Sequence, residues 1–162
     1  MIVAPLLRRG YTVFAVYHLS QPDATIMEIV EDVSKALRYV RAHADRFGVD
    51  PERLAAIGAS SGGHLALMLA CKAGSVPSLG MAAGPARLRA VAAFSPVTDL
   101  LDLGASTENP GNGGPPRSFV QAFGPDATNL DQWRRIGRAV SPIYHVHPSC
   151  CRRSFSMETL TP

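Results

Sequence analysis

The stretch 58–64, of sequence Gly-Ala-Ser-Ser-Gly-Gly-His, contains the residues best suited to chemistry. Ser60 stands between Gly58 and Gly62 in the spacing G-x-S-x-G, which is typical of a serine nucleophile on a sharp turn between a strand and a helix. A turn this tight strains the backbone at the serine, and its neighbours two residues away must lack side chains to avoid a collision. We therefore predict that Ser60 is a nucleophile.

Two apolar runs flank this turn, as the arrangement requires. Residues 54–57 form a short run that predicts a buried strand, and residues 65–70 are rich in Leu, Ala and Met, which predicts a buried helix. Gly63 lets the helix start close against the sheet. The positive end of the helix would then lie near the negative charge that develops during attack by Ser60.

Other functions of glycine-rich turns fit less well. No Lys-Ser or Lys-Thr pair follows the glycines, as a phosphate-binding P-loop requires. The glycine spacing also misses the G-x-G-x-x-G pattern of dinucleotide-binding folds. A plain βα turn without chemistry is the remaining alternative.

The rest of the chain alternates between strand and helix patterns. Residues 2–9 predict the end of a helix that stops at Gly10, and residues 11–17 predict a strand because they are β-branched and aromatic. A capping box of Thr25 and Glu28 opens an amphipathic helix that we expect to run to Gly48.

Residues 90–94 then predict another buried strand. This order indicates an α/β fold with a doubly wound, mostly parallel sheet. Residues 102–140 predict an excursion, lid-like over the site or without contact to substrate, with an exposed loop over 104–118.

Composition bounds the classes of function. The 162 residues carry a formal net charge of +3, with 46% apolar and 18% charged residues, so we expect a globular domain and no nucleic-acid partner. The cysteines lack zinc spacing, and Cys71 falls in the predicted buried helix, so we expect no metal and no cofactor. No segment is long enough to span a membrane. No signal peptide is evident and the N-terminus reads as truncated, so the localisation stays open.

The elbow and its flanks resemble the α/β-hydrolase superfamily. The likeness covers most of residues 4–146 and is strongest over 11–70, where the strand at 11–16, the Ser-Gln-Pro loop at 20–22 and the elbow follow each other. The segments 95–99 and 141–146 also resemble its esterase/lipase branch, of the feruloyl- and acetyl-esterase-like, BD-FAE or hydrolase fold-3 type. The chain is thus similar to a partial α/β-hydrolase domain over 1–148.

This resemblance implies a serine ester hydrolase with a Ser-Asp-His triad. By position, Ser60 matches the nucleophile and the backbone N–H of Ser61 matches one donor of the oxyanion hole. The substrate would be a small-molecule or carbohydrate ester. The family's His-Gly-Gly oxyanion segment is absent from this sequence, and so are its acid and histidine. We therefore expect the chain, as given, to be nearly inactive.

Four histidines and one aspartate are further candidates for residues of the site. His64 is more typical of a local hydrogen-bonding residue than of a base, and Asp99 of loop stabilisation, although either could serve the site. His18 could line a pocket or lie on the surface. We assign neither His145 nor His147 as the base.

Two other functions stay open at this point. The chain could be an inactive hydrolase-like fragment that binds a ligand, or a fragment of a prolyl-oligopeptidase-type peptidase, which shares the elbow.

Residues 149–162 match neither strand nor helix, so we predict a non-native or disordered tail. A shifted reading frame of this tail permits a His-Gly-Asp segment, which predicts a frameshift that the nucleotide sequence can test.

Overall fold

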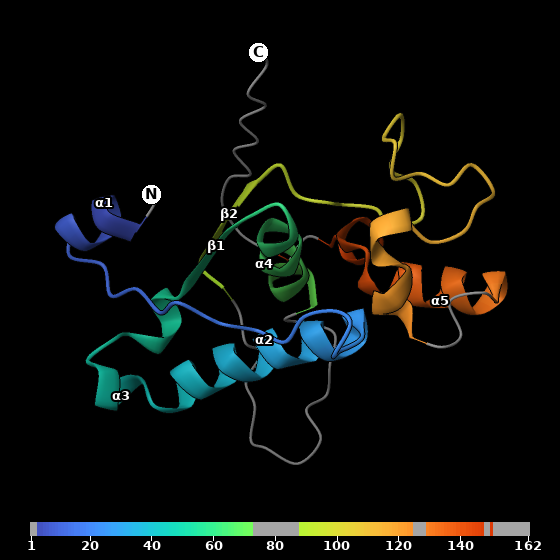
Figure 1. Cartoon of the computed structure of the whole chain (residues 1–162). Helices are drawn as coiled ribbons and strands as arrows, with labels where there is room; N and C mark the ends of the chain where they lie inside the picture. The colour runs from blue at the N-terminus through green and yellow to red at the C-terminus, as the bar shows by residue number, and fades with distance from the viewer. Residues whose placement is uncertain (1–2, 73–87, 125–128, 148–149, 151–162) are drawn as a thin grey trace.

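The computed structural model describes residues 3–72, 88–124, 129–147 and 150 (Figure 1). Along the chain the elements are α1 (Val3–Arg8), α2 (Ile26–Ala42), α3 (Ala44–Phe47), η1 (Pro51–Arg53), β1 (Ala55–Ala59), α4 (Ser61–Lys72), β2 (Ala90–Phe94), η2 (Arg117–Phe123), α5 (Leu130–Val140) and η4 (Pro142–His145), where η marks a 3₁₀ helix. Residues 73–87, after α4, and all of the tail except Cys150 lie outside the described residues.

A parallel pair of strands, β1 and β2, forms the sheet of the described residues. Ala55 pairs with Ala90, and the register continues to Ala59 opposite Phe94. Parallel neighbours need a crossover, and α4 lies between the two strands in sequence and beside them in space (Figure 1). The strand–helix–strand order confirms the predicted α/β class.

Among the described residues, only one face of β1 is covered, which corrects the prediction of a buried strand. Ala56 packs into a cluster with Leu67 and Val91, which lie on α4 and β2. On the opposite face, Ala55, Ile57 and Ala59 are exposed, and Ile57 keeps 43% of its surface accessible. The apolar run of β1 therefore reflects a parallel sheet strand with one covered face among the described residues.

Helix α2 begins as its sequence predicts. The Thr25 side chain accepts from the Glu28 N–H, and the Glu28 carboxylate accepts from the Thr25 N–H at 2.8 Å, which completes the capping box. The helix ends earlier than predicted, at Ala42, because the backbone of His43 leaves the helical region at ψ 24°. A separate turn, α3, then runs to Gly48, whose left-handed conformation ends it.

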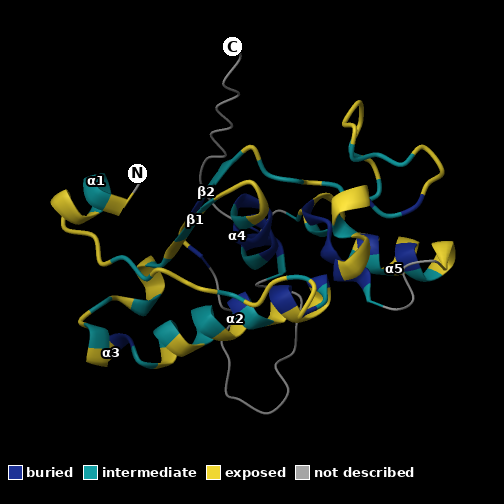
Figure 2. Ribbon diagram, in the orientation of Figure 1, coloured by how far each residue is buried: buried dark blue, intermediate teal, exposed yellow. Residues whose placement is uncertain are grey.

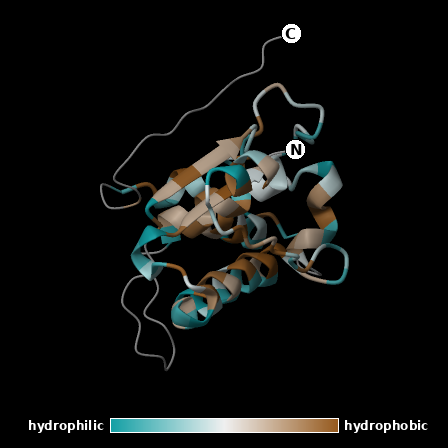
Figure 3. Ribbon diagram, turned by 90° about the vertical axis from the view of Figure 1, so that its left-hand side faces the viewer, coloured by the Kyte–Doolittle hydropathy of each residue, from teal (hydrophilic) through white to brown (hydrophobic). Residues whose placement is uncertain are grey.

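The apolar side of α2 faces the main core. Ile26, Ile29, Val30 and Val33 are buried, and they cluster with Met68 of α4. Figure 2 shows the buried residues concentrated in α4 and along one side of α2, and Figure 3 shows hydrophobic residues gathered at the centre of the molecule. This core fixes α4, and with it the turn at the start of α4.

Residues 11–17 do not form the predicted strand. Their backbone has no regular secondary structure, and Tyr11, Val16 and Tyr17 are exposed. β-branched and aromatic residues favour an extended backbone, but a strand also needs a neighbour for its hydrogen bonds. No described strand pairs with this segment, because the sheet of the described residues consists of β1 and β2.

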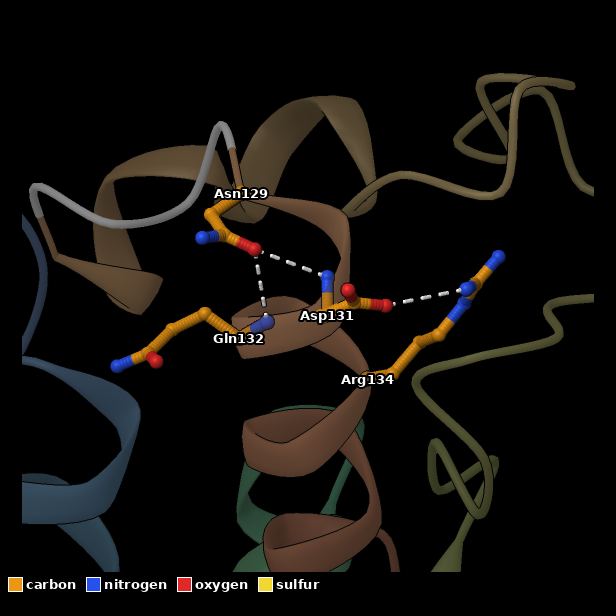
Figure 4. Close-up of polar contacts among 4 residues, drawn as sticks. All are labelled: Asn129, Asp131, Gln132 and Arg134. Atoms are coloured by element: carbon orange, nitrogen blue, oxygen red, sulfur yellow. Dashed lines mark hydrogen bonds and ion pairs between the residues drawn. The ribbon is translucent and has the colours of Figure 1, made fainter.

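The excursion at 102–140 is loop first and helical later. Residues 104–116 have no helix or strand, so the loop predicted over 104–118 ends two residues early, where η2 begins, and α5 follows. Figure 4 shows how α5 begins: the Asn129 side chain accepts from the N–H groups of Asp131 and Gln132, and Arg134 pairs with Asp131 at 3.5 Å. Trp133 then anchors α5 in the core, fully buried.

Candidate active site

Ser60 occupies a sharp turn between β1 and α4. Its φ of 51° lies in the left-handed region, which a residue other than glycine rarely adopts. The Ser60 N–H donates to the Phe94 carbonyl at 2.9 Å, and the Ser60 carbonyl accepts from the His64 N–H at 3.0 Å. Ser60 is therefore held by both the sheet and the first turn of the helix, while its side chain stays exposed.

The glycines around this turn are not equivalent. A Cβ on Gly58 would lie 2.2 Å from the Gly62 carbonyl oxygen, so no side chain fits there. A Cβ on Gly63 would lie 3.2 Å from both the Gly58 oxygen and the Pro96 Cβ, which agrees with the predicted close approach of helix and sheet. The expectation for Gly62 was wrong, because a Cβ at that position would meet nothing within 4 Å.

The first turn of α4 presents free N–H groups beside Ser60. Ser61 is the first residue of the helix, so its N–H has no partner within the helix. Among the described residues no other group accepts from it. The positive end of the helix dipole lies at the same place. This arrangement can stabilise negative charge close to Ser60.

A second serine with a left-handed backbone lies beside Ser60. Ser95 follows β2 directly and has a φ of 45°. Since Ala59 pairs with Phe94, Ser60 and Ser95 are the residues that directly follow the last pair of the two strands. Ser60 and Ser95 are the only non-glycine residues with positive φ in the described part of the chain, and both are exposed. Strained backbone of this kind clusters at functional sites.

His64 is a buried hydrogen-bonding residue, but its side chain bonds to a distant segment of the chain and not to local backbone as the sequence predicted. Its Nε2 lies 2.6 Å from the Val140 carbonyl oxygen, so Nε2 carries the proton and the bond joins α4 to the end of α5. Burial lowers the pKa of His64, and the bond to Val140 opposes this shift only in part. The ring is therefore neutral near pH 7.

The other candidate residues mostly stabilise loops. Asp99 accepts from the Leu101 N–H at 2.8 Å and from the Tyr144 hydroxyl at 3.0 Å, in agreement with the predicted role in loop stabilisation. His145 lies against the backbone carbonyls that end α5, and His147 lies 3.1 Å from the Cys71 carbonyl oxygen.

A cavity of about 230 Å³ opens at the start of α4. Its walls come from the loop before α2, the first turns of α2 and α4, the segment after β2, and η2 of the excursion. Ser61, His64 and His18 belong to this lining, and Ser60 does not. The pocket-lining interpretation of His18 is thus correct.

Within the described residues, no imidazole or carboxylate hydrogen bonds to the Ser60 hydroxyl. No group of three or more His, Cys, Asp or Glu side chains that could hold a metal occurs in this part of the chain. Nor does it contain a helix long and apolar enough to cross a membrane.

Sequence reasoning missed two contributors to this site. Ser95 begins the segment 95–99, which carries part of the resemblance, but no pattern gave Ser95 itself a role, and its position became clear only with the register of the two strands. Ser141, fully buried, donates to the Gly137 carbonyl and accepts from the Leu100 N–H at 2.8 Å, so it joins α5 to the segment after β2. The Ser-Pro pair at 141–142 predicts a turn, but it does not predict these hydrogen bonds of Ser141.

Comparisons with known proteins agree with this geometry. The chain is 33% identical over 69 residues to a probable carboxylic ester hydrolase, LipM, of Mycobacterium tuberculosis (strain ATCC 25618 / H37Rv), covering 43% of this chain and 16% of that protein. It is 36% identical over 61 residues to a probable isoprenylcysteine alpha-carbonyl methylesterase, ICMEL1, of Oryza sativa subsp. japonica, covering 38% and 14%. The chain thus spans a small part of the length of these relatives.

A solved structure matches over nearly the whole chain. A truncated form of a carbohydrate esterase from gut microbiota superposes with a TM-score of 0.63 at 25% identity, and the match covers 90% of this chain and 54% of that one. The fold is accordingly a partial α/β-hydrolase fold. The family model BD-FAE matches residues 1–151. With this elbow and this match over nearly its full length, the chain belongs to the BD-FAE family.

Proposed function

We propose that this chain carries the nucleophile of a serine carboxylic ester hydrolase. The Ser60 hydroxyl oxygen attacks the ester carbonyl carbon, and its proton passes to a base. The carbonyl oxygen becomes negative in the tetrahedral intermediate, and the Ser61 N–H donates to it. Collapse of the intermediate returns this proton to the leaving oxygen, releases the alcohol and leaves an acyl group on Ser60, which water then removes as a carboxylic acid.

One observation carries the proposal: Ser60 has a left-handed backbone at a strand-to-helix turn, with the free N–H of Ser61 next to it. A loop serine without chemistry has no need of this strain. The Gly58 and Gly63 contacts support the same interpretation, because they allow α4 to approach the sheet closely enough to hold the turn.

The proposal also names a class of substrate. The relatives named above are described as a carboxylic ester hydrolase, a methylesterase and a carbohydrate esterase. These descriptions favour an esterase over a peptidase of the prolyl-oligopeptidase type. We therefore propose small-molecule or carbohydrate esters as substrates.

Labelling with a fluorophosphonate probe tests the nucleophile. In a longer protein that contains this chain, Ser60 is expected to be the labelled serine, detected by mass spectrometry of the peptide. Ser60→Ala should abolish labelling. Ser61→Ala is the matched control, because it keeps the backbone N–H and removes only a hydroxyl that the mechanism does not use. Labelling that persists in Ser60→Ala would contradict the assignment of Ser60 as the nucleophile.

The 162-residue chain alone should turn over p-nitrophenyl acetate very weakly. The described residues place no base on Ser60, and loss of triad function costs roughly a million-fold in rate. Robust turnover that Ser60→Ala abolishes would instead indicate a substitute base, with the nearby neutral His64 as the first residue to replace.

A further inference from the structure

The end of α5 and the start of η4 bond to two parts of the site at once. We call this stretch, residues 137–144, the α5–η4 junction. On one side, its Val140 carbonyl accepts from Nε2 of His64, on the first turn of α4, at 2.6 Å. On the other side, its Ile143 N–H donates to the Thr98 carbonyl, in the segment after β2, at 3.2 Å. The junction therefore links the start of α4 to the segment after β2.

Ser141 adds a second link to that segment. Its hydroxyl is fully buried, donates to the Gly137 carbonyl at 2.6 Å and accepts from the Leu100 N–H at 2.8 Å. A Cβ on Gly137 would lie 2.4 Å from Cδ2 of Leu101, so α5 approaches the same segment closely at this point. Loss of one partner of a buried hydrogen bond is costly, because the other partner is left unsatisfied. The junction and the segment after β2 are thus fixed relative to each other.

His64 connects this junction to Ser60. The His64 N–H donates to the Ser60 carbonyl at 3.0 Å, while its ring donates to Val140. The Ser60 N–H in turn donates to the Phe94 carbonyl at the end of β2. The left-handed backbone of Ser60 persists only where its surroundings hold it. His64 and the end of β2 hold it from two sides.

We propose that His64 and Ser141 are positioning residues for the nucleophile. Through the α5–η4 junction they hold the first turn of α4, which carries the Ser61 N–H, in the geometry that attack by Ser60 requires. The proposal makes α5 part of the fixed frame of the site and not of a lid. It rests on the proposed function for what Ser60 does, but the contacts themselves can be tested without any chemistry.

Amide hydrogen exchange of the 162-residue chain, followed by NMR, tests these contacts. His64→Ala removes the bond to Val140, so it should speed exchange of the Ser60 N–H at least about tenfold more than that of the Met68 N–H, farther along α4. His64→Gln restores a donor and should return the ratio of the two rates to within about threefold of the unaltered chain. Equal acceleration of both amides in His64→Ala would indicate a general loss of stability and would overturn the proposal.

Ser141→Ala is the second variant. It removes the donor to Gly137 and the acceptor of Leu100, so it should have the same selective effect on the Ser60 N–H. The matched control is Ser34→Ala, because the Ser34 hydroxyl also donates to the carbonyl four residues before it, at 2.7 Å, but this bond stays within α2. Equal exchange of the Ser60 N–H in the two serine variants would contradict the role of Ser141. The two His64 variants still test the junction if Ser141→Ala fails to fold.

A longer protein that contains this chain adds a measurement on the nucleophile itself. His64→Ala should lower the maximal rate constant of fluorophosphonate labelling at Ser60 at least about tenfold, and leave the half-saturating probe concentration within about twofold. His64→Gln should restore most of this rate. Glutamine cannot act as a base, so the rescue separates positioning from proton transfer. Equal losses of rate in both variants would overturn the proposal.

The two proposals can fail separately. Absent labelling of Ser60 in the unaltered protein would reject the serine hydrolase, and the exchange rates would still decide whether His64 and Ser141 hold the turn. Labelling of Ser60 without the selective change in exchange would keep the nucleophile and reject the positioning role.

Discussion

At the scale of single residues, His64 couples the site to pH. It lies 4% exposed on the first turn of α4, and its Nε2 proton goes to the Val140 carbonyl. Burial lowers its pKa in the folded chain below the ordinary value of 6.5. The unfolded chain therefore takes up a proton on acidification before the folded chain does, so acid favours unfolding.

We expect the free energy of unfolding to fall as the pH drops below about 6.5, by at most about 1.4 kcal/mol per pH unit from this group. His64→Gln keeps a donor for Val140 but cannot titrate, so its stability should depend less on pH between 6.5 and 5. Urea unfolding at several pH values measures this. The matched control is His43→Gln at the end of α2, which should keep the slope of the unaltered chain. An equal slope for His64→Gln would contradict the assignment.

At the scale of elements, the elbow depends on one glycine more than on its neighbours. Gly58→Ala would place a Cβ 2.2 Å from the Gly62 oxygen, and backbone cannot yield cheaply. We expect a loss of at least about 2 kcal/mol in stability. Gly62→Ala meets open space on the first turn of α4, so it should be neutral or stabilise by roughly 0.5–1 kcal/mol. Thermal unfolding of both variants tests this, and equal losses would show that the turn can rearrange.

At the scale of the whole molecule, we expect the face of β1 that the described residues leave uncovered to govern association. Ile57 exposes 43% of its surface on this face, and β1 has a partner on one edge among the described residues. Open edges and apolar faces pair with other copies. We expect the chain to associate as its concentration rises, and Ile57→Thr to reduce this while keeping the strand. Sedimentation velocity measures it, with Val120→Thr, equally exposed on η2, as control. Identical behaviour of both variants would refute a role for this face.

Local signals were predictable from the sequence, and long-range contacts were not. The capping box at Thr25 and the turn at Ser60 involve neighbours along the chain, and the structure has both. Gly48 does end a helix, but that helix is the short α3, because α2 ends earlier at Ala42. The strand at 11–17 failed because pairing depends on a neighbour that propensity cannot supply. The bond from His64 to Val140 spans 76 residues, so no local pattern could reveal it.

The adjacent left-handed serines, Ser60 and Ser95, also bear on what selection acts upon. Glycine adopts this backbone without strain, so at both positions a glycine would make a sturdier fold. Selection for folding alone would therefore replace both serines, given time. A related protein that keeps both serines retains their hydroxyl groups at a cost in stability. The pair therefore distinguishes proteins that still use this site from proteins that no longer do.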